Sequence, residues 1–128
     1  ARTWTDAWEA LDVEAIVALY AEDCVFSSQP FREPYRGRAG VREYVTAAFA
    51  SEANPRVWVS SPLVDDRRAS ISWWCALRED GEDATLAGTS VIRFDADDLV
   101  AEQWDAWNVL DQRREPPTIW SPFADRDA

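Results

Sequence analysis

"RASISWWCALREDGEDATLAGTSVIRFDADDLVAEQWDAWN", residues 68–108, is the stretch that decides the fold. Apolar and polar residues alternate over 68–79, 84–94 and 99–108, which is the period of a half-buried strand. The interruptions, "EDGED" and "DADD", are rich in Asp and Gly, and these residues favour tight turns. The stretch therefore predicts three long strands joined by tight turns, an antiparallel meander.

The alternation also predicts which side chains face the core. On the first strand the apolar face carries Ala69, Ile71, Trp73, Cys75 and Leu77. On the second strand the more apolar face carries Leu86, Gly88, Ser90, Ile92 and Phe94. On the third strand each face holds one tryptophan and at least one acid, so the pattern alone leaves the direction of Asp105 open.

Upstream of the meander, the apolar residues follow the period of helices. The first stripe consists of Trp4, Ala7, Trp8 and Leu11, and a later one of Val41, Tyr44, Val45, Ala48 and Phe49. Between them Asp12 is expected to cap a second helix through 12–23, and the last helix ends before Pro55. The segment 56–64 predicts a fourth strand. Helices followed by a curled antiparallel sheet predict an α+β domain whose helices cover the concave face.

Composition excludes several kinds of catalytic site. The 128 residues are expected to form a single domain over 1–128. They include no histidine and no lysine, so all 13 basic residues are arginine. The chain therefore has no Ser-His-Asp or Cys-His nucleophile and no Schiff-base lysine. Acid–base chemistry must fall to carboxylates, tyrosine, cysteine or bound water. Carboxylates would need a dry pocket that raises their pKa toward the working pH.

Charge and hydropathy narrow the expected partners and location. The formal net charge of −11 argues against nucleic acid and anionic lipid, because both need a basic surface. No apolar run reaches the roughly 18 residues of a membrane span, and no signal peptide opens the chain. We therefore expect a cytoplasmic protein with no membrane partner. Cys24 and Cys75 are expected to be buried, reduced thiols, with a bridge between them left open.

Three segments carry a further signal: "W..AWEALDVEAIVALYAEDCVF" (4–26), "PYRGRAGVREYV" (34–45) and "GTSVIRFDADDLVAEQWDAW" (88–107). In this order they resemble the nuclear transport factor 2-like superfamily, in particular its SnoaL-like branch. The resemblance implies a cone-shaped half barrel of curved antiparallel sheet, capped by three N-terminal helices that close an apolar pocket. It also implies a homodimer through the outer face of the sheet.

The resemblance separates two kinds of activity. Ketosteroid isomerases use a general-base aspartate, a tyrosine and a protonated aspartic acid. The matching positions here hold Ser28 or Gln29, Trp4 and Ser90, so that mechanism is not expected. Epoxide hydrolases and SnoaL-type cyclases of the superfamily use a pocket aspartate, which in the hydrolases lies on the last strand. The run "DAWN" resembles the hydrolases' Asp–x–aromatic–Asp, although its final acid is absent, and it matches Asp105 to the catalytic aspartate.

The resemblance implies that Asp105 points inward with Gln103 and Trp107, where burial against indole rings would raise its pKa. Asp105 would then act as general acid or base. In that account Gln103 and Ser90 orient the substrate or a water, and Tyr20 donates a hydrogen bond. The alternatives are an inward Asp105 that serves only as a structural anion, and an exposed Asp105.

The expected pocket combines the core-facing stripes with the "PFREPY" loop at its rim. Its lining is expected to consist of Trp8, Tyr20, Phe31, Tyr44, Trp73, Ser90, Gln103 and Trp107. Core packing without a ligand is the alternative for each of them. The sequence thus predicts a protein that binds a small, largely apolar molecule, possessing either a cofactor-independent isomerase, cyclase or hydrolase activity or a non-catalytic ligand-binding or dimerisation role.

The remaining expectations concern the surface. Trp74 and Trp104 fall on the outward faces of their strands and would form an apolar patch that joins two copies of the chain. Acidic pairs at the predicted turns are typical turn residues. No phosphate-binding glycine loop or metal motif is present, so no cofactor and no metal are expected. The runs "DQRREPP" and "WSPFADRDA" near the end of the chain predict a surface strap.

Overall fold

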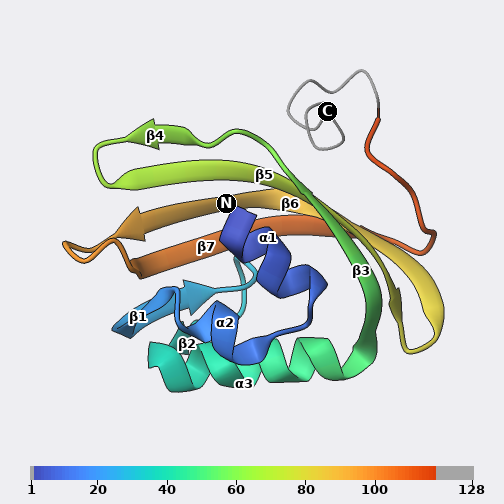
Figure 1. Ribbon diagram of the computed structural model, residues 1–128, viewed down its shortest axis with the longest axis horizontal. Helices are drawn as coiled ribbons and strands as arrows, with labels where there is room; N and C mark the ends of the chain where they lie inside the picture. Colours follow the sequence, from blue (N-terminus) through green and yellow to red (C-terminus); the bar gives the residue numbers. More distant parts are fainter. Residues whose placement is uncertain (1, 118–128) are drawn as a thin grey trace.

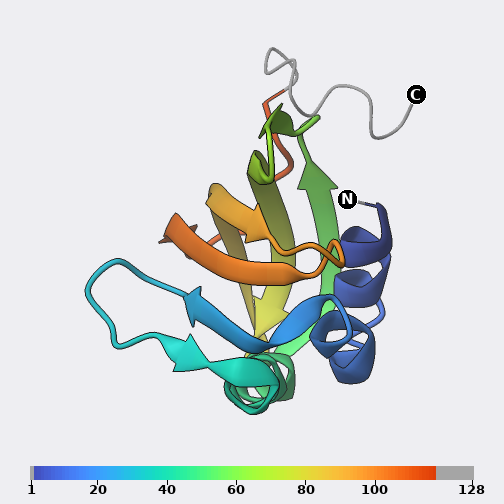
Figure 2. The same ribbon diagram turned by 90° about the vertical axis from the view of Figure 1, so that its left-hand side faces the viewer.

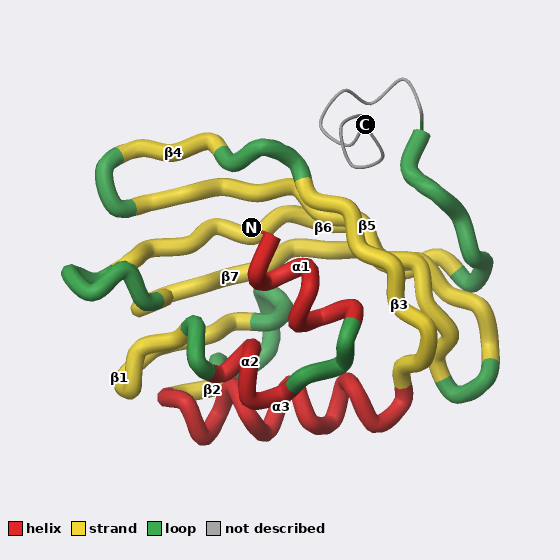
Figure 3. Tube along the Cα trace, in the orientation of Figure 1, coloured by secondary structure: helices red, strands yellow, loops and turns green. Residues whose placement is uncertain are grey.

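The computed structural model describes residues 2–117 and has the expected α+β architecture, with helices lying against one face of a curved, open sheet (Figures 1 and 3). The helices within these residues are α1 (Arg2–Glu9), α2 (Val13–Val17) and α3 (Gly37–Ser51). The strands are β1 (Tyr20–Ser27), β2 (Tyr35–Arg36), β3 (Glu52–Val59), β4 (Leu63–Asp65), β5 (Arg68–Glu79), β6 (Glu82–Phe94) and β7 (Val100–Leu110).

The sheet has the order β2-β1-β7-β6-β5-β3, and β4 pairs with β5. The meander predicted from residues 68–108 is confirmed, because β5 pairs with β6 and β6 with β7, both antiparallel. The turn from β5 to β6 contains Asp80 and Gly81, both with positive φ, a conformation that Gly and, less readily, Asp tolerate. The fourth strand expected over 56–64 is divided between β3 and β4.

The second helix also differs from the sequence-based prediction. The helix expected over 12–23 ends at Val17, and the chain enters β1 at Tyr20. β1 pairs with β7 in parallel, with Phe26 opposite Gln103, so the sheet is mixed and not wholly antiparallel. The physical reason is tertiary, since pairing with β7 overrides the helical period that Tyr20 shares with the residues before it.

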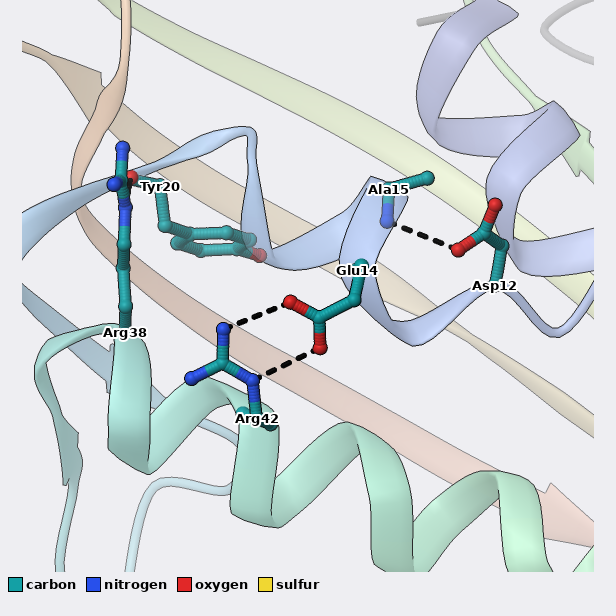
Figure 4. A network of polar contacts seen from close by, with 6 residues as sticks. All are labelled: Asp12, Glu14, Ala15, Tyr20, Arg38 and Arg42. Carbon is teal, nitrogen blue, oxygen red and sulfur yellow. Dashed lines mark hydrogen bonds and ion pairs between the residues drawn. The ribbon is translucent and has the colours of Figure 1, made fainter.

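Polar contacts hold α2 and the start of β1 against α3 (Figure 4). Asp12 caps α2 as expected, accepting a bond of 3.1 Å from the backbone N–H three residues along. Arg42 on α3 pairs with Glu14 through two bonds of 2.9 Å. Arg38, also on α3, donates from Nε to the backbone carbonyl of Tyr20 at 2.7 Å. These contacts fix the point at which the Tyr20 ring enters the interior.

The chain that follows β7 lies against the outer face of the sheet. The buried Thr85 hydroxyl on β6 donates to the carbonyl of Gln112 at 2.7 Å and accepts from the N–H of Arg114 at 2.8 Å. The carbonyl of Arg114 accepts the indole N–H of Trp74 at 2.7 Å. The expected surface strap therefore forms here, while the tail "WSPFADRDA" lies outside the described residues.

The main core joins α2 and α3 to β1 and includes Ile16, Val41 and Val45. Cys24 and Cys75 are buried and free, the expected state. In the described part of the chain, no helix is long and apolar enough to cross a membrane.

Candidate functional site

A cavity with two chambers lies between the helices and the concave face of the sheet. A first chamber of about 60 Å³ adjoins a second chamber of about 150 Å³. The two share the side chains of Trp4, Tyr20, Trp73 and Gln103. Aromatic and aliphatic groups make up most of both linings. An apolar cavity of about 150 Å³ is large enough to hold a benzene ring, so the chambers together suit a small molecule.

The structure brings most of the expected pocket residues together. The first chamber is lined by Trp8, Tyr20, Tyr44, Trp73, Gln103, Asp105 and Trp107, among others. Ser90 lines the second chamber and connects to the first through its hydrogen bond to Asp105. Asp105 thus faces inward with Gln103 and Trp107, the direction that the resemblance implies.

Phe31 is the exception among these residues. It is fully exposed in the loop between β1 and β2, which projects from the body of the protein (Figure 2). The carbonyl of Gln29 accepts bonds from the Ser27 hydroxyl and from the backbone N–H of Arg32. The loop therefore turns tightly at this point and presents Phe31 to solvent. The expectation that Phe31 lines the pocket is corrected accordingly.

Asp105 lies opposite Ser90 in the register of β6 and β7, and one of its carboxyl oxygens is fixed from two sides. Oδ1 accepts a bond of 2.6 Å from the Ser90 hydroxyl and one of 3.0 Å from the Gln103 amide. Both donors are themselves oriented. The Trp73 indole donates to Ser90 Oγ at 3.0 Å, and the Tyr20 hydroxyl donates to Gln103 Oε1 at 2.6 Å. Two hydrogen-bond chains therefore converge on Oδ1.

The second oxygen of Asp105, Oδ2, receives no hydrogen bond from the described residues. Because Oδ1 already accepts two bonds, a proton bound to Asp105 lies on Oδ2. Burial raises the pKa of Asp105 from 3.8 to about 6, while the bonds from Ser90 and Gln103 act to lower it. Near neutral pH the carboxyl is therefore mainly ionised yet close enough to its pKa to exchange a proton.

Gly88 lacks a side chain and so leaves space for the neighbouring strand and its tryptophan at the site. It lies between Trp73 on β5 and Trp107 on β7 in the strand register. A Cβ on Gly88 would lie 2.3 Å from the carbonyl oxygen of Ala106 and 2.6 Å from the Cβ of Trp107, so the position requires glycine. Trp107 donates its indole N–H to the carbonyl of Ser28 at 2.7 Å, which ties β7 to the end of β1.

Glu52, the first residue of β3, is a candidate functional residue that the sequence analysis missed. It lines the first chamber. Burial, reinforced by the charge of Glu79, raises the pKa of Glu52 from 4.5 to about 7, and a bond from the Trp8 indole opposes the change. In the sequence it belongs to "SEANP", which predicts only the end of a helix. No local pattern shows that it faces inward, because its direction depends on the pairing of β3 with β5.

The chambers thus combine exchangeable protons with hydrogen-bond donors and apolar walls. Burial raises the pKa of both Tyr20 and Tyr44 above the usual range, so both phenols remain protonated. Within residues 2–117 no three potential metal ligands form a group. Such a space is suited to holding a small apolar molecule and moving a proton on it while restricting water.

Comparison with known proteins identifies the domain. Residues 1–103 match the SnoaL-like domain. The chain belongs to the SnoaL-like family. Asp105 lies just beyond the matched residues, so its candidacy in this SnoaL-like domain depends on the geometry described above. No curated protein gives a significant match to the chain.

Solved structures share the SnoaL-like fold. The epoxide hydrolase/cyclase-like enzyme SalBIII, described for pyran ring formation in the polyether salinomycin, has a TM-score of 0.73 at 12% identity, over 83% of this chain and 88% of that chain. A protein from Shewanella denitrificans named as a SnoaL-like polyketide cyclase has a TM-score of 0.72 at 15% identity, over 84% and 86%. RV0760c from Mycobacterium tuberculosis has a TM-score of 0.75 at 15% identity, over 85% and 90%. At such identities the likeness shows the fold alone.

Proposed function

We propose that this SnoaL-like protein binds a small, largely apolar molecule in its two chambers and that Asp105 transfers a proton to or from it. The activity is that of a cofactor-independent isomerase, cyclase or hydrolase. One observation carries the proposal: Ser90 and Gln103 hold Oδ1 of Asp105, while Oδ2 is left for a ligand at an apolar chamber. The names of two structural relatives, an epoxide hydrolase/cyclase-like enzyme and a polyketide cyclase, support this range of reactions.

In the proposed reaction the ionised Asp105 acts first as a base. Oδ2 takes a proton from a carbon beside a carbonyl, or from a water whose oxygen bonds to an epoxide carbon as the epoxide C–O bond breaks. The resulting carboxylic acid then returns the proton to carbon or to the new alkoxide oxygen. The bonds from Ser90 and Gln103 keep the carboxyl aimed throughout, and the indoles of Trp73 and Trp107 restrict access of bulk water.

Proton exchange tests the proposal without requiring the natural substrate. The assays are hydrogen–deuterium exchange into 4-methylcyclohexanone and hydrolysis of cyclohexene oxide, both followed by NMR. The protein should accelerate at least one of them, and Asp105→Asn should lower that rate about 10²-fold or more. Asp111→Asn removes an exposed carboxylate just after β7 and should leave the rate unchanged. Equal rates for wild type and Asp105→Asn would contradict the proposal.

We further propose that the outer face of the sheet joins two copies of the chain. Two large apolar side chains are exposed on the outer face of β7, Trp104 at 60% and Leu110 at 36%, and such a patch is typical of an interaction surface. Trp74 contributes less than the sequence suggests, because it is half-buried and its indole binds the carbonyl of Arg114 in the strap. The proposed contact therefore centres on Trp104.

A further inference from the structure

The first chamber contains a second carboxyl group, that of Glu52, which the proposed reaction does not use. Its Oε1 is buried and has no hydrogen-bond partner, alone among the buried side-chain oxygens and nitrogens of the described residues. The indole of Trp8 lies close to the same carboxyl and acts to lower its pKa. Oε1 of Glu52 is therefore available to a molecule in the chamber.

The surroundings of Glu52 favour its neutral form. The carboxylate of Glu79 lies opposite it in the register of β3 and β5, and burial together with that charge raises the pKa of Glu52 to about 7. Cys75 on β5 also faces this region, and the charges of Glu9 and Arg113 act on its thiol with opposite sign. No arginine is among the groups that act on Glu52 itself in the described part of the chain. Because no protein group bonds to Oε1, the neutral acid can carry its proton there and donate it to a ligand.

Glu52 and Asp105 face the same space. Both line the first chamber, and both raise the pKa of the Tyr44 phenol through their charges. Tyr44 therefore lies within electrostatic reach of each carboxyl. A molecule bound against Tyr44 with its reacting atom at Asp105 would present another part of itself to Glu52.

We propose that Glu52 is a ligand-binding residue whose Oε1 donates a hydrogen bond to an acceptor oxygen, so that the ligand carries a carbonyl or ether oxygen in addition to the group that reacts at Asp105. This inference rests on the proposed function, because it concerns the same chambers and the same ligand. An apolar group against Glu52 would leave a buried donor unpaired. A neutral pair of carboxylic acid and carbonyl satisfies it without placing an ion among apolar walls. The favoured ligand class is thus an apolar ring or chain with two separated oxygen functions.

Two ketones of similar size test the inference. Cyclohexane-1,4-dione carries a second carbonyl where 4-methylcyclohexanone carries a methyl group. Their dissociation constants are measured by tryptophan fluorescence in the wild type, Glu52→Leu and Glu52→Gln. The preference for the dione is the dissociation constant of 4-methylcyclohexanone divided by that of the dione. This ratio should be about three- to tenfold larger in the wild type than in Glu52→Leu, which is the usual effect of one neutral hydrogen bond. Glu52→Gln keeps an N–H donor and should keep most of the preference.

The pH dependence of ketone binding shows whether Glu52 donates a hydrogen bond to the ligand or accepts one. Near pH 9 Glu52 is ionised and the wild type should lose its preference for the dione, whereas Glu52→Gln should retain it. Asp105→Asn should leave the preference intact, because it changes the other carboxyl. An equal preference in wild type and Glu52→Leu would overturn the inference while leaving the proposed function standing. Binding of neither ketone by the wild type would overturn both.

Discussion

At the scale of single residues, burial and hydrogen bonding act on Asp105 in opposite directions. Burial raises its pKa, the bonds from Ser90 and Gln103 lower it, and the result is a value of about 6 against the usual 3.8. Because the folded-state pKa is the higher one, ionisation is less favourable in the folded protein than in the unfolded chain. The stability associated with the neutral carboxyl is fully present below about pH 4 and is lost as the pH rises through about 6.

Replacement of Asp105 by asparagine should therefore stabilise the protein while removing proton transfer. Asparagine keeps a side-chain oxygen for the Ser90 and Gln103 donors and carries no charge. The free energy of unfolding should rise by about 1–3 kcal/mol near pH 8 and change little near pH 4. Urea denaturation at the two pH values measures this, with Asp111→Asn as the control. A loss of stability near pH 8 would mean that Asp105 is a structural anion.

Ser90→Ala should move the pH dependence of any Asp105-catalysed reaction. The variant removes a bond of 2.6 Å that favours the ionised carboxyl, so the pKa of Asp105 should rise further. Loss of one hydrogen bond of about 1 kcal/mol shifts the acidic limb of the rate profile upward by about one pH unit. The measurement is the rate of ketone exchange across the pH range. An unchanged profile would show that the Ser90 bond does not tune the carboxyl.

At the scale of elements, the packing of β6 against β7 depends on Gly88. Gly88→Ala would place a methyl group 2.3 Å from the carbonyl oxygen of Ala106 and 2.6 Å from the Cβ of Trp107, which forces the strands apart. The expected cost is about 1–3 kcal/mol, with altered tryptophan emission because Trp107 must move. Gly81→Ala is the contrast, since open space surrounds that position and only its positive φ opposes the change. Thermal unfolding of the two variants compares these costs. A Gly88→Ala protein with wild-type stability would contradict the packing described here.

The elements that the sequence predicts well are those whose pattern is local. Strands β5, β6 and β7 alternate strictly enough, with turn residues between them, that their pairing follows from residues 68–108 alone. β1 could not be predicted in this way. Tyr20 continues the helical spacing of Ile16 and Val17, and the strand forms because distant β7 offers a parallel partner.

The same distinction holds for the residues of the site: those on a strand with a regular pattern could be predicted, and the others could not. Asp105, Gln103 and Trp107 share one face of a single strand, so a resemblance that placed one of them inward placed all three. The sequence around Glu52 has no such pattern. Glu52 points inward because the chain turns from α3 into β3 at that residue. The prediction that Phe31 lines the pocket rests on its loop alone, and a loop carries no period that indicates the direction of a side chain.

At the scale of the whole molecule, the sheet has one face closed by helices and another that is only partly covered. The strap at Gln112 and Arg114 shields part of the outer face, and Trp104 on β7 remains 60% exposed. Since an exposed apolar patch of this kind favours association, the oligomeric state is a property of the intact chain and not of any single strand.

Trp104→Glu should convert the proposed dimer into a monomer. A charge at the centre of a symmetric contact meets its own copy across the interface and opposes association. Sedimentation velocity at micromolar concentration is the measurement, and Phe31→Glu is the control, because it changes an exposed aromatic residue outside the sheet. A wild-type protein that sediments as a monomer would contradict the proposed interface.

The most direct test of the central claim is the titration of the Asp105 carboxyl carbon itself by NMR in ¹³C-labelled protein, assigned by comparison with Asp105→Asn. The account predicts a midpoint at about pH 6, well above the usual 3.8 for aspartate, and a signal that disappears in the variant. A midpoint at or below 3.8 would show a carboxylate held permanently ionised by Ser90 and Gln103, and would contradict its role in proton transfer.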